Sequence, residues 1–199
     1  MTGRVNVEAR HRILEVAREL FHTRGLGGVS MEDVAGAAGI KKANLFHYYH
    51  SKESLELAVL EQAAGEMKEQ IRAQLSSSGR DPVGAVASMF DQAGRWMRER
   101  RCRGGCFLGN VAQEASDHNE TIRLRVSELL HYWMEQIAAS LDRARSAGYF
   151  RPDLEPTPAA EAILALFEGA LLFSKASRRD GPVESSKRMA VAYLQGFRA

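Results

Sequence analysis

The segment RCRGGCFLGNVAQEASDHNE holds the side chain best suited to covalent chemistry, the thiol of Cys106. Cys106 directly follows the Gly104-Gly105 pair, whose backbone freedom permits a close turn before a new helix. Amide dipoles at a helix N-terminus and the nearby cations of Arg101 and Arg103 favour the thiolate, which is the form of cysteine that reacts. The sequence therefore predicts a reactive thiol. The alternative is that Cys106 is a small buried residue filling a contact between helices.

A second segment, KKANLFHYY, covers residues 41–49 and has side chains that can read DNA bases. As a short helix it would turn Leu45 and Tyr49 inward and leave its polar side chains outside. Asn44 can pair with an adenine edge and Ala43 can contact a thymine methyl group, while lysines neutralise phosphates. A polar helix face that only closes a core is the alternative. The side chains predicted to face DNA from this segment and its flank are those of Lys41, Lys42, Ala43, Asn44, His47, Tyr48 and Lys52.

The distribution of charge weakly supports a DNA-facing N-terminal region. The whole chain of 199 residues has a formal net charge of only +2, which by itself does not indicate a nucleic-acid partner. Residues 1–52 carry eight Lys or Arg against five Asp or Glu, so the remaining residues are slightly acidic. This asymmetry suits a basic DNA-binding module on a nearly neutral body.

A reading helix must be held by other helices, and the N-terminal sequence provides them. Apolar residues at helical spacing predict a helix over 8–24, which ends before Gly25. Ser30, with Asp33 three residues later, can cap a second helix over 30–38, and Gly39 ends it. Helices over 41–47 and 52–75 complete the region. Two short helices joined by a glycine-containing turn and braced by a preceding helix are typical of a helix-turn-helix.

The rest of the chain is also predicted to be helical. The small, polar stretch SSSGRDP at 76–82 is the best break in the sequence. Helices are expected after it over 82–100, 106–116, 119–147, 157–179 and 183–198, and no useful strand pattern is present. We therefore predict an all-α protein with a three-helix helix-turn-helix domain over 1–52, a connecting helix and linker over 53–80, and an effector-sensing and dimerisation domain over 81–199.

The segment VSMEDVAGAAGIKKANLFHYYHSKESL resembles the DNA-binding segment of TetR-family repressors. It matches the usual pattern of that family at positions that include Gly39, Leu45 and Glu53. The resemblance implies that DNA is contacted by Ser30, Lys42, Ala43, Asn44, His47, Tyr48 and Lys52. It also implies a homodimer in which the last two helices pair with their symmetry mates as a four-helix bundle. Alternatively, those helices only complete the core of the monomer.

The pattern G-C-x-x-x-N-x-x-x-E, formed by Gly105, Cys106, Asn110 and Glu114, resembles a branch of TetR regulators that includes repressors responsive to electrophiles and oxidants. Members of that branch also tend to have a lysine late in the penultimate helix, where this chain has Lys175. An ammonium group beside the Cys106 thiol would lower the pKa of that thiol. The simpler interpretation is that Lys175 is a solvated cation at the end of its helix.

A non-covalent effector is the other possible switch. The family usually holds its effector in a cavity among the middle helices, and each aromatic residue there could instead be ordinary core. The residues expected to line such a cavity are Phe90, Trp96, Phe107, Asn110, His131, Trp133 and Phe167.

Other functions have little support in the sequence. No phosphate-binding loop, dinucleotide glycine motif or metal-binding helix is present, so we expect no cofactor, no metal and no enzyme, with a helical enzyme using Cys106 as a remote alternative. No apolar run could span a membrane and no signal peptide is evident, so a cytoplasmic location is expected. The overall prediction is a repressor released from its double-stranded DNA operator by a small-molecule effector or by modification of Cys106. In the alternative, the effector is non-covalent and Cys106 is only structural.

Overall fold

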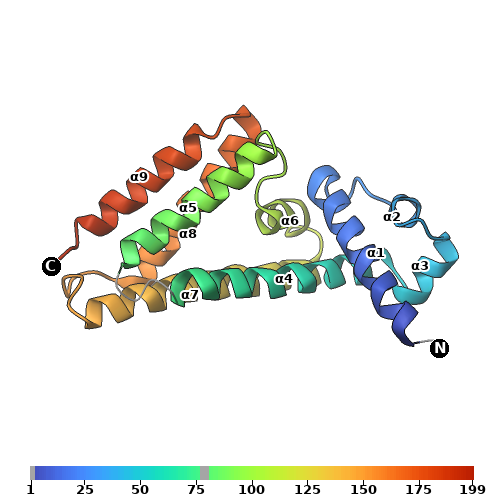
Figure 1. The fold of residues 1–199 in the computed structure, drawn as a ribbon, viewed down its shortest axis with the longest axis horizontal. Helices are drawn as coiled ribbons and strands as arrows, with labels where there is room; N and C mark the ends of the chain where they lie inside the picture. The colour runs from blue at the N-terminus through green and yellow to red at the C-terminus, as the bar shows by residue number, and fades with distance from the viewer. Residues whose placement is uncertain (1–2, 77–80) are drawn as a thin grey trace. The chain divides into compact units, whose positions relative to one another are not determined.

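A computed structural model describes residues 3–76 and 81–199, and within them the chain is helical apart from loops and one isolated β-bridge between Phe150 and Arg198 (Figure 1). This confirms the predicted all-α fold. In the described ranges, none of the helices combines the length and apolar character that crossing a bilayer requires. The helices are α1 (Gly3–Arg24), α2 (Met31–Ala37), α3 (Lys42–Tyr48), α4 (Lys52–Ser76), α5 (Pro82–Glu99), α6 (Phe107–Ala115), α7 (Glu120–Ser146), α8 (Pro156–Ser177) and α9 (Gly181–Gln195).

The predicted helices are all observed, with small differences at their ends. The first helix begins at Gly3 rather than near residue 8, and the last ends at Gln195 rather than near 198. Residues 77–80 of the predicted linker lie outside the described residues. After them, Asp81 caps α5 by accepting the backbone N–H of Gly84 at 2.9 Å, and Pro82 occupies the first turn.

Packing divides the chain into two compact units. The first contains Met1–Glu66 and Asn110–Val126, and the second contains Met67–Gly109 and Ser127–Ala199. Helices α4, α6 and α7 therefore each contribute residues to both units. The functional division into 1–52, 53–80 and 81–199 stays a prediction, because a unit defined by packing is not a unit defined by activity.

The core of the first unit is built on helical spacing in α1. Ile13, Ala17 and Phe21 recur every four residues and are buried, and α1 packs against α2, which packs against α3. Phe21 accepts the N–H of Gly25 at 2.9 Å, and Gly25 has the left-handed φ of +79° that ends α1. The N-terminal helices are thereby fixed as a brace for α3.

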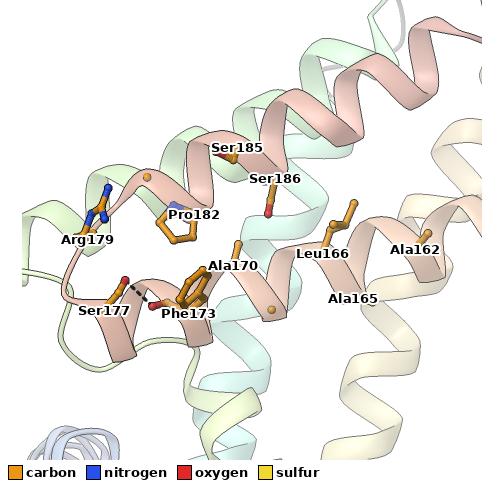
Figure 2. Close-up of a pocket in the computed structure, with 12 residues that line it drawn as sticks. Ala162, Ala165, Leu166, Ala170, Phe173, Ser177, Arg179, Pro182, Ser185 and Ser186 are labelled. Carbon is orange, nitrogen blue, oxygen red and sulfur yellow. Dashed lines mark hydrogen bonds between the residues drawn. The ribbon is translucent and has the colours of Figure 1, made fainter.

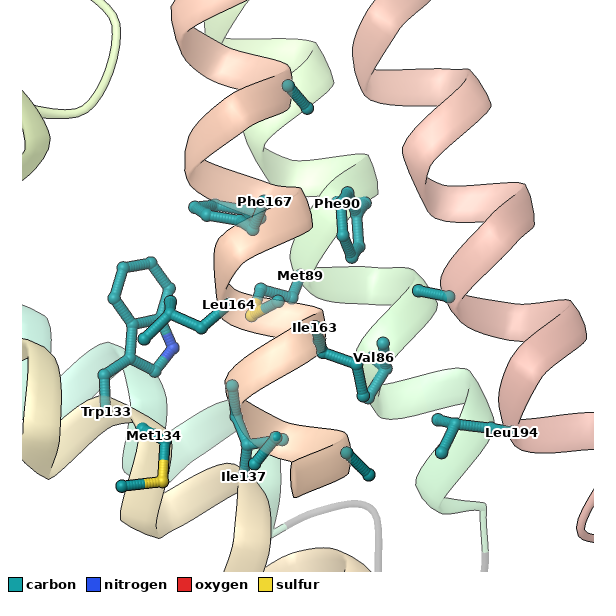
Figure 3. Packing of buried hydrophobic residues seen from close by; sticks show 14 of the residues in the cluster. Val86, Met89, Phe90, Trp133, Met134, Ile137, Ile163, Leu164, Phe167 and Leu194 are labelled. Atoms are coloured by element: carbon teal, nitrogen blue, oxygen red, sulfur yellow. The ribbon is translucent and has the colours of Figure 1, made fainter. Parts of the chain in front are cut away.

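The core of the second unit lies among α5, α7, α8 and α9 (Figure 3). Phe167 of α8 makes edge-to-face contacts with Phe90 of α5, at 5.3 Å between ring centroids, and with Trp133 of α7, at 5.0 Å. Helix α9 packs along both α5 and α8 and buries Leu194. The three aromatic rings thus connect three helices at the centre of this unit.

Candidate nucleic-acid interface

Helix α2 begins with a complete capping box, as predicted. The Ser30 hydroxyl accepts the N–H of Asp33 at 3.1 Å, and the Asp33 carboxylate accepts the N–H of Ser30 at 2.8 Å. These bonds to Ser30 lower the pKa of Asp33, which keeps the carboxylate ionised at the positive end of the helix dipole. The start of α2 is therefore rigid, and Ser30 lies exposed at that start.

The turn between α2 and α3 is short and internally bonded. Gly39 adopts a left-handed φ of +67°, and the N–H of Ile40 donates to the carbonyl of Ala35 at 3.0 Å. A side chain at Gly39 would be strained in that conformation. This turn sets α3 at a fixed angle to α2.

Helix α3 has one buried side and one exposed side, as its sequence predicts. Leu45 is fully buried and Tyr49 is 4% exposed, and the Tyr49 hydroxyl accepts a hydrogen bond from Nε of Arg10 at 3.2 Å. Tyr48 is half-buried. The exposed residues of this segment are Lys41, Lys42, Ala43, Asn44, Phe46 and His47. We refer to Lys42, Ala43, Asn44 and His47 as the reading face.

Two lysines, one in the reading face and one at the start of α4, are paired with carboxylates. Lys42 Nζ lies 3.3 Å from Glu32 on α2, and Lys52 Nζ lies 3.7 Å from Glu56 one turn further along α4. Glu56 is buried, and burial raises its pKa while the charge of Lys52 opposes that shift. The Lys42–Glu32 pair is exposed and therefore weak, so Lys42 can exchange its carboxylate partner for a phosphate. Lys52 is itself half-buried and keeps a buried partner.

The predicted sensor, Cys106, lies at the N-terminal end of α6 after a tight loop. Gly104 and Gly105 have φ values of +88° and +74°, which confirms the close turn expected from the glycine pair. The Cys106 Sγ accepts the N–H of Gly109 at 3.5 Å, and its thiol donates to the carboxylate of Glu168 on α8. Cys106 thus joins the first turn of α6 to α8 within the second unit.

The electrostatic environment of Cys106 is the reverse of the one expected. Burial raises the pKa of the thiol well above its ordinary value, and the negative charge of Glu168 raises it further, outweighing the N–H of Gly109. Burial also raises the pKa of Glu168, whose Oε1 atom has no hydrogen-bond partner among the described residues. Lys175 is half-buried in the last turn of α8. The charged group with the strongest effect on the Cys106 pKa is therefore the acid Glu168.

The residues expected to line an effector cavity do not all come together. Phe90, Trp133 and Phe167 contact one another and Trp96 packs against the same cluster, while Phe107 is buried. His131 lies on the exposed side of α7, 3.2 Å from Glu135, so its expected position in a cavity is wrong. A histidine at that point of the helical repeat faces away from Trp133. Asn110 belongs to the first unit, whereas the other expected residues belong to the second.

An exposed groove of about 700 Å³ runs along α8 and α9 of the second unit (Figure 2). Leu166 and Phe173 of α8 line it, with Pro182 of α9 opposite. Phe173 is 64% exposed, and Met189 and Tyr193 of α9 are exposed as well. We call this set of apolar residues on α8 and α9 the α8–α9 face.

Two residues that make contacts in these sites, Glu168 and Glu114, were not predicted to make them. Glu168 accepts a hydrogen bond from the Cys106 thiol. The feature of the sequence that could have indicated this contact is an acidic residue inside the apolar run of α8. Glu114 was noted only as part of a pattern, and the structure shows that it binds the turn after α1.

The braced α2–α3 pair and its exposed reading face define a DNA-binding regulator of the helix-turn-helix class. Comparison with known families agrees with this assignment. A model described as "Bacterial regulatory proteins, tetR family" matches residues 13–59, and one described as "Tetracyclin repressor-like, C-terminal domain" matches residues 82–190, which is more than half of the chain. The chain therefore belongs to the TetR family, whose members bind DNA operators and dimerise. These proteins are transcriptional regulators rather than enzymes, as the sequence predicted.

Several relatives match almost the whole chain at low identity. The HTH-type transcriptional repressor DhaR of Mycobacterium sp. (strain GP1) is 24% identical over 88% of this chain and 86% of its own length. The repressor NemR of Escherichia coli K12 is 22% identical over 90% of both chains, and its reduced form superposes with a TM-score of 0.85. A TetR regulator from Chloroflexus aurantiacus, 26% identical, has a TM-score of 0.88 over 96% of both chains. These likenesses agree with the helical order described above.

Proposed function

We propose that this protein is a transcriptional repressor that binds its operator as a homodimer and is released when an effector acts on the second unit. The observation that carries the proposal is the reading face, in which four exposed side chains lie on one side of α3 while Leu45 and Tyr49 anchor the other side. Relatives named as repressors, DhaR and NemR, support repression as the output. Because its target is genomic DNA, the proposed place of action is the cytoplasm.

The roles proposed for individual residues follow from chemistry and exposure. Asn44 can donate to and accept from an adenine edge, and Ala43 is small enough to admit a thymine methyl group. Positive charge for the DNA phosphates is supplied by Lys41, Lys42 and Lys52. Hydrogen-bond donors to the sugar-phosphate backbone of DNA are supplied by Ser30, His47 and Tyr48. All of these side chains are exposed or half-buried.

The α8–α9 face supports the proposed dimer. Large apolar side chains such as Phe173 and Met189 lie exposed together on two adjacent helices, whereas Val183, Ala190 and Leu194 of α9 already fill the core of the monomer. Exposed apolar surface of this kind is unfavourable in water and is typical of a subunit interface. A second copy of the chain would cover it by pairing α8 and α9 with the same helices of its partner.

Two routes of release are proposed, and the geometry at Cys106 favours the first. Because burial and Glu168 keep Cys106 as a neutral thiol, a non-covalent effector bound near Phe90, Trp96, Phe107, Trp133 and Phe167 is the principal route. The second route is covalent modification of Cys106, which would remove its bonds to Gly109 and Glu168. Lys175 enters only in this second route, as a proposed partner of the modified cysteine.

The DNA-binding part is tested with operator DNA selected by the wild-type protein from a random duplex pool. We expect Asn44→Ala to weaken binding about tenfold to a hundredfold, because one bidentate base contact is lost. The melting temperature should not fall, since Asn44 is exposed and away from the core. His131→Ala, an exposed change on α7, is the matched control and should bind as the wild type does. Unchanged binding by Asn44→Ala would contradict the assigned reading face.

The route of release is tested on the same complex with N-ethylmaleimide as the electrophile. Release that the Cys106→Ser variant resists would assign the switch to covalent modification. Binding that is indifferent to the reagent, in a protein whose Cys106 is shown by mass spectrometry to be alkylated, would exclude this route. The non-covalent route would then stand.

A further inference from the structure

Glu114, at the end of α6, binds the turn that follows α1. Its Oε2 atom accepts the N–H of Leu26 at 2.7 Å, and its Oε1 atom accepts the N–H of Gly27 at 2.5 Å. The two donors are separated from Glu114 by more than eighty residues in the chain and belong to the same compact unit. Hydrogen bonds to an ionised acceptor are about twice as strong as neutral ones, so one carboxylate holds this turn at two adjacent points.

The turn is shaped to receive a carboxylate. Gly25 has a left-handed φ of +79°, and a Cβ atom there would lie 2.7 Å from Glu114 Oε2. A Cβ atom at Gly27 would lie 3.1 Å from Glu114 Oε1, and one at Gly28 would overlap the carbonyl of Arg24. Only a glycine-rich turn can bring its backbone this close to the carboxylate while exposing successive N–H groups.

The turn held by Glu114 leads directly into α2 and α3, the two helices of the helix-turn-helix. Leu26 and Val29 are buried on either side of it, and Ser30 at its end caps α2. Helix α2 in turn packs on α3. The position of the turn therefore sets where α2 begins, and α2 sets the position of the reading face.

From this geometry we propose that Glu114 is a positioning residue for operator binding, because its carboxylate fixes the turn from which α2 begins. The inference rests on the proposed DNA-binding function. While the carboxylate holds the turn, α2 and α3 are set for DNA. Loss of the carboxylate frees the turn and lowers operator affinity.

The test compares Glu114→Gln with Glu61→Gln. Glutamine keeps the shape of Glu114 but accepts through only one of the two atoms, so one N–H loses its partner. Glu61 is a matched control, because it is a carboxylate of the same unit that pairs with Arg125 and has no bond to the turn. We expect Glu114→Gln to bind the selected operator about tenfold more weakly, and to exchange the amide hydrogens of Leu26 and Gly27 faster. Glu61→Gln should match the wild type in both measurements.

The affinity for random-sequence DNA separates positioning from simple loss of folding. A merely structural Glu114 would lower specific and non-specific affinity together, whereas a positioning residue affects the specific complex alone. Gly27→Ala disturbs the contact between Gly27 and Glu114 from the side of the turn. It provides a second variant should Glu114→Gln fold poorly. Its loss of operator affinity should not add to that of Glu114→Gln, because both changes act on one contact.

The experiments distinguish failure of the proposed role of Glu114 from failure of the proposed DNA-binding function. Operator binding by Glu114→Gln and by Gly27→Ala within twofold of the wild type overturns the role of Glu114, as does an equal loss in Glu61→Gln. A wild-type protein that enriches no duplex from the pool overturns the DNA-binding proposal itself.

Discussion

The Cys106 side chain lies between groups with opposite effects on its ionisation. The N–H of Gly109 stabilises a thiolate, while burial and the carboxylate of Glu168 destabilise it. Burial has the largest effect, so the thiol is the ground state. At the scale of the residue, the reactivity of Cys106 therefore depends on Glu168 more than on the arginines that precede it in sequence.

Replacing Glu168 with Gln should make Cys106 more reactive. The ionised carboxylate raises the pKa of the thiol, so its removal lowers that pKa and increases the thiolate fraction at a fixed pH. We expect alkylation by iodoacetamide at pH 8 to be about fivefold faster, with the pH midpoint of the rate shifted downward. The rate is measured by mass spectrometry of the modified peptide.

The control for this change is Glu161→Gln, an exposed acid on the same helix. Its alkylation rate should equal that of the wild type. An unchanged rate in Glu168→Gln would show that Glu168 does not affect the thiolate.

At the scale of the helix, the α8–α9 face carries apolar side chains that the monomer leaves in water. Helix α9 buries Leu194 and Ala190 on one side and exposes Met189 and Tyr193 on the other. A helix that is apolar on two sides requires two partners, and the monomer supplies only the inner one.

A charge in the α8–α9 face should weaken the dimer. Phe173→Glu places a carboxylate at a position that the proposed interface desolvates, so we expect the dimer dissociation constant to rise roughly a hundredfold. Light scattering should change from about 44 kDa, twice the 22.0 kDa of the chain, towards the mass of one chain. The affinity for operator DNA should fall as the dimer dissociates.

Leu124→Glu is the matched control, because Leu124 is an exposed leucine of α7 outside the α8–α9 face, with an exposed fraction of 49%. This variant should remain dimeric. A dimeric Phe173→Glu protein would place the interface elsewhere.

At the scale of the whole molecule, DNA binding has to arise from local charge, because the net charge is only +2. The lysines available to phosphates, Lys41, Lys42 and Lys52, lie at and beside α3. A dimer that uses all three on each chain should release about five counterions, which gives a slope of roughly −5 for log affinity against log salt concentration.

Lys42→Gln should make this slope less steep by about 2, since a dimer loses two phosphate contacts. The slope is measured by fluorescence anisotropy of a labelled operator at several salt concentrations. Lys187→Gln is the control, because Lys187 pairs with Asp91 and Glu184 in the second unit and should leave the slope unchanged. Equal slopes for wild type and Lys42→Gln would remove Lys42 from the DNA contacts.

Features that depend on neighbours a few residues away could be predicted from the amino-acid sequence. The order of the helices, the capping box of Ser30 and Asp33, and the inward positions of Leu45 and Tyr49 follow from turn chemistry and the helical repeat, so they were predicted correctly, whereas the outer ends of α1 and α9 differ from the prediction by a few residues. Contacts between groups far apart in the chain became known only from the fold. It placed Glu168 beside Cys106, turned His131 outward and brought Glu114 to the turn after α1. The pKa of a thiol and the partner of a carboxylate depend on burial and through-space distance, and local spacing in a sequence specifies neither.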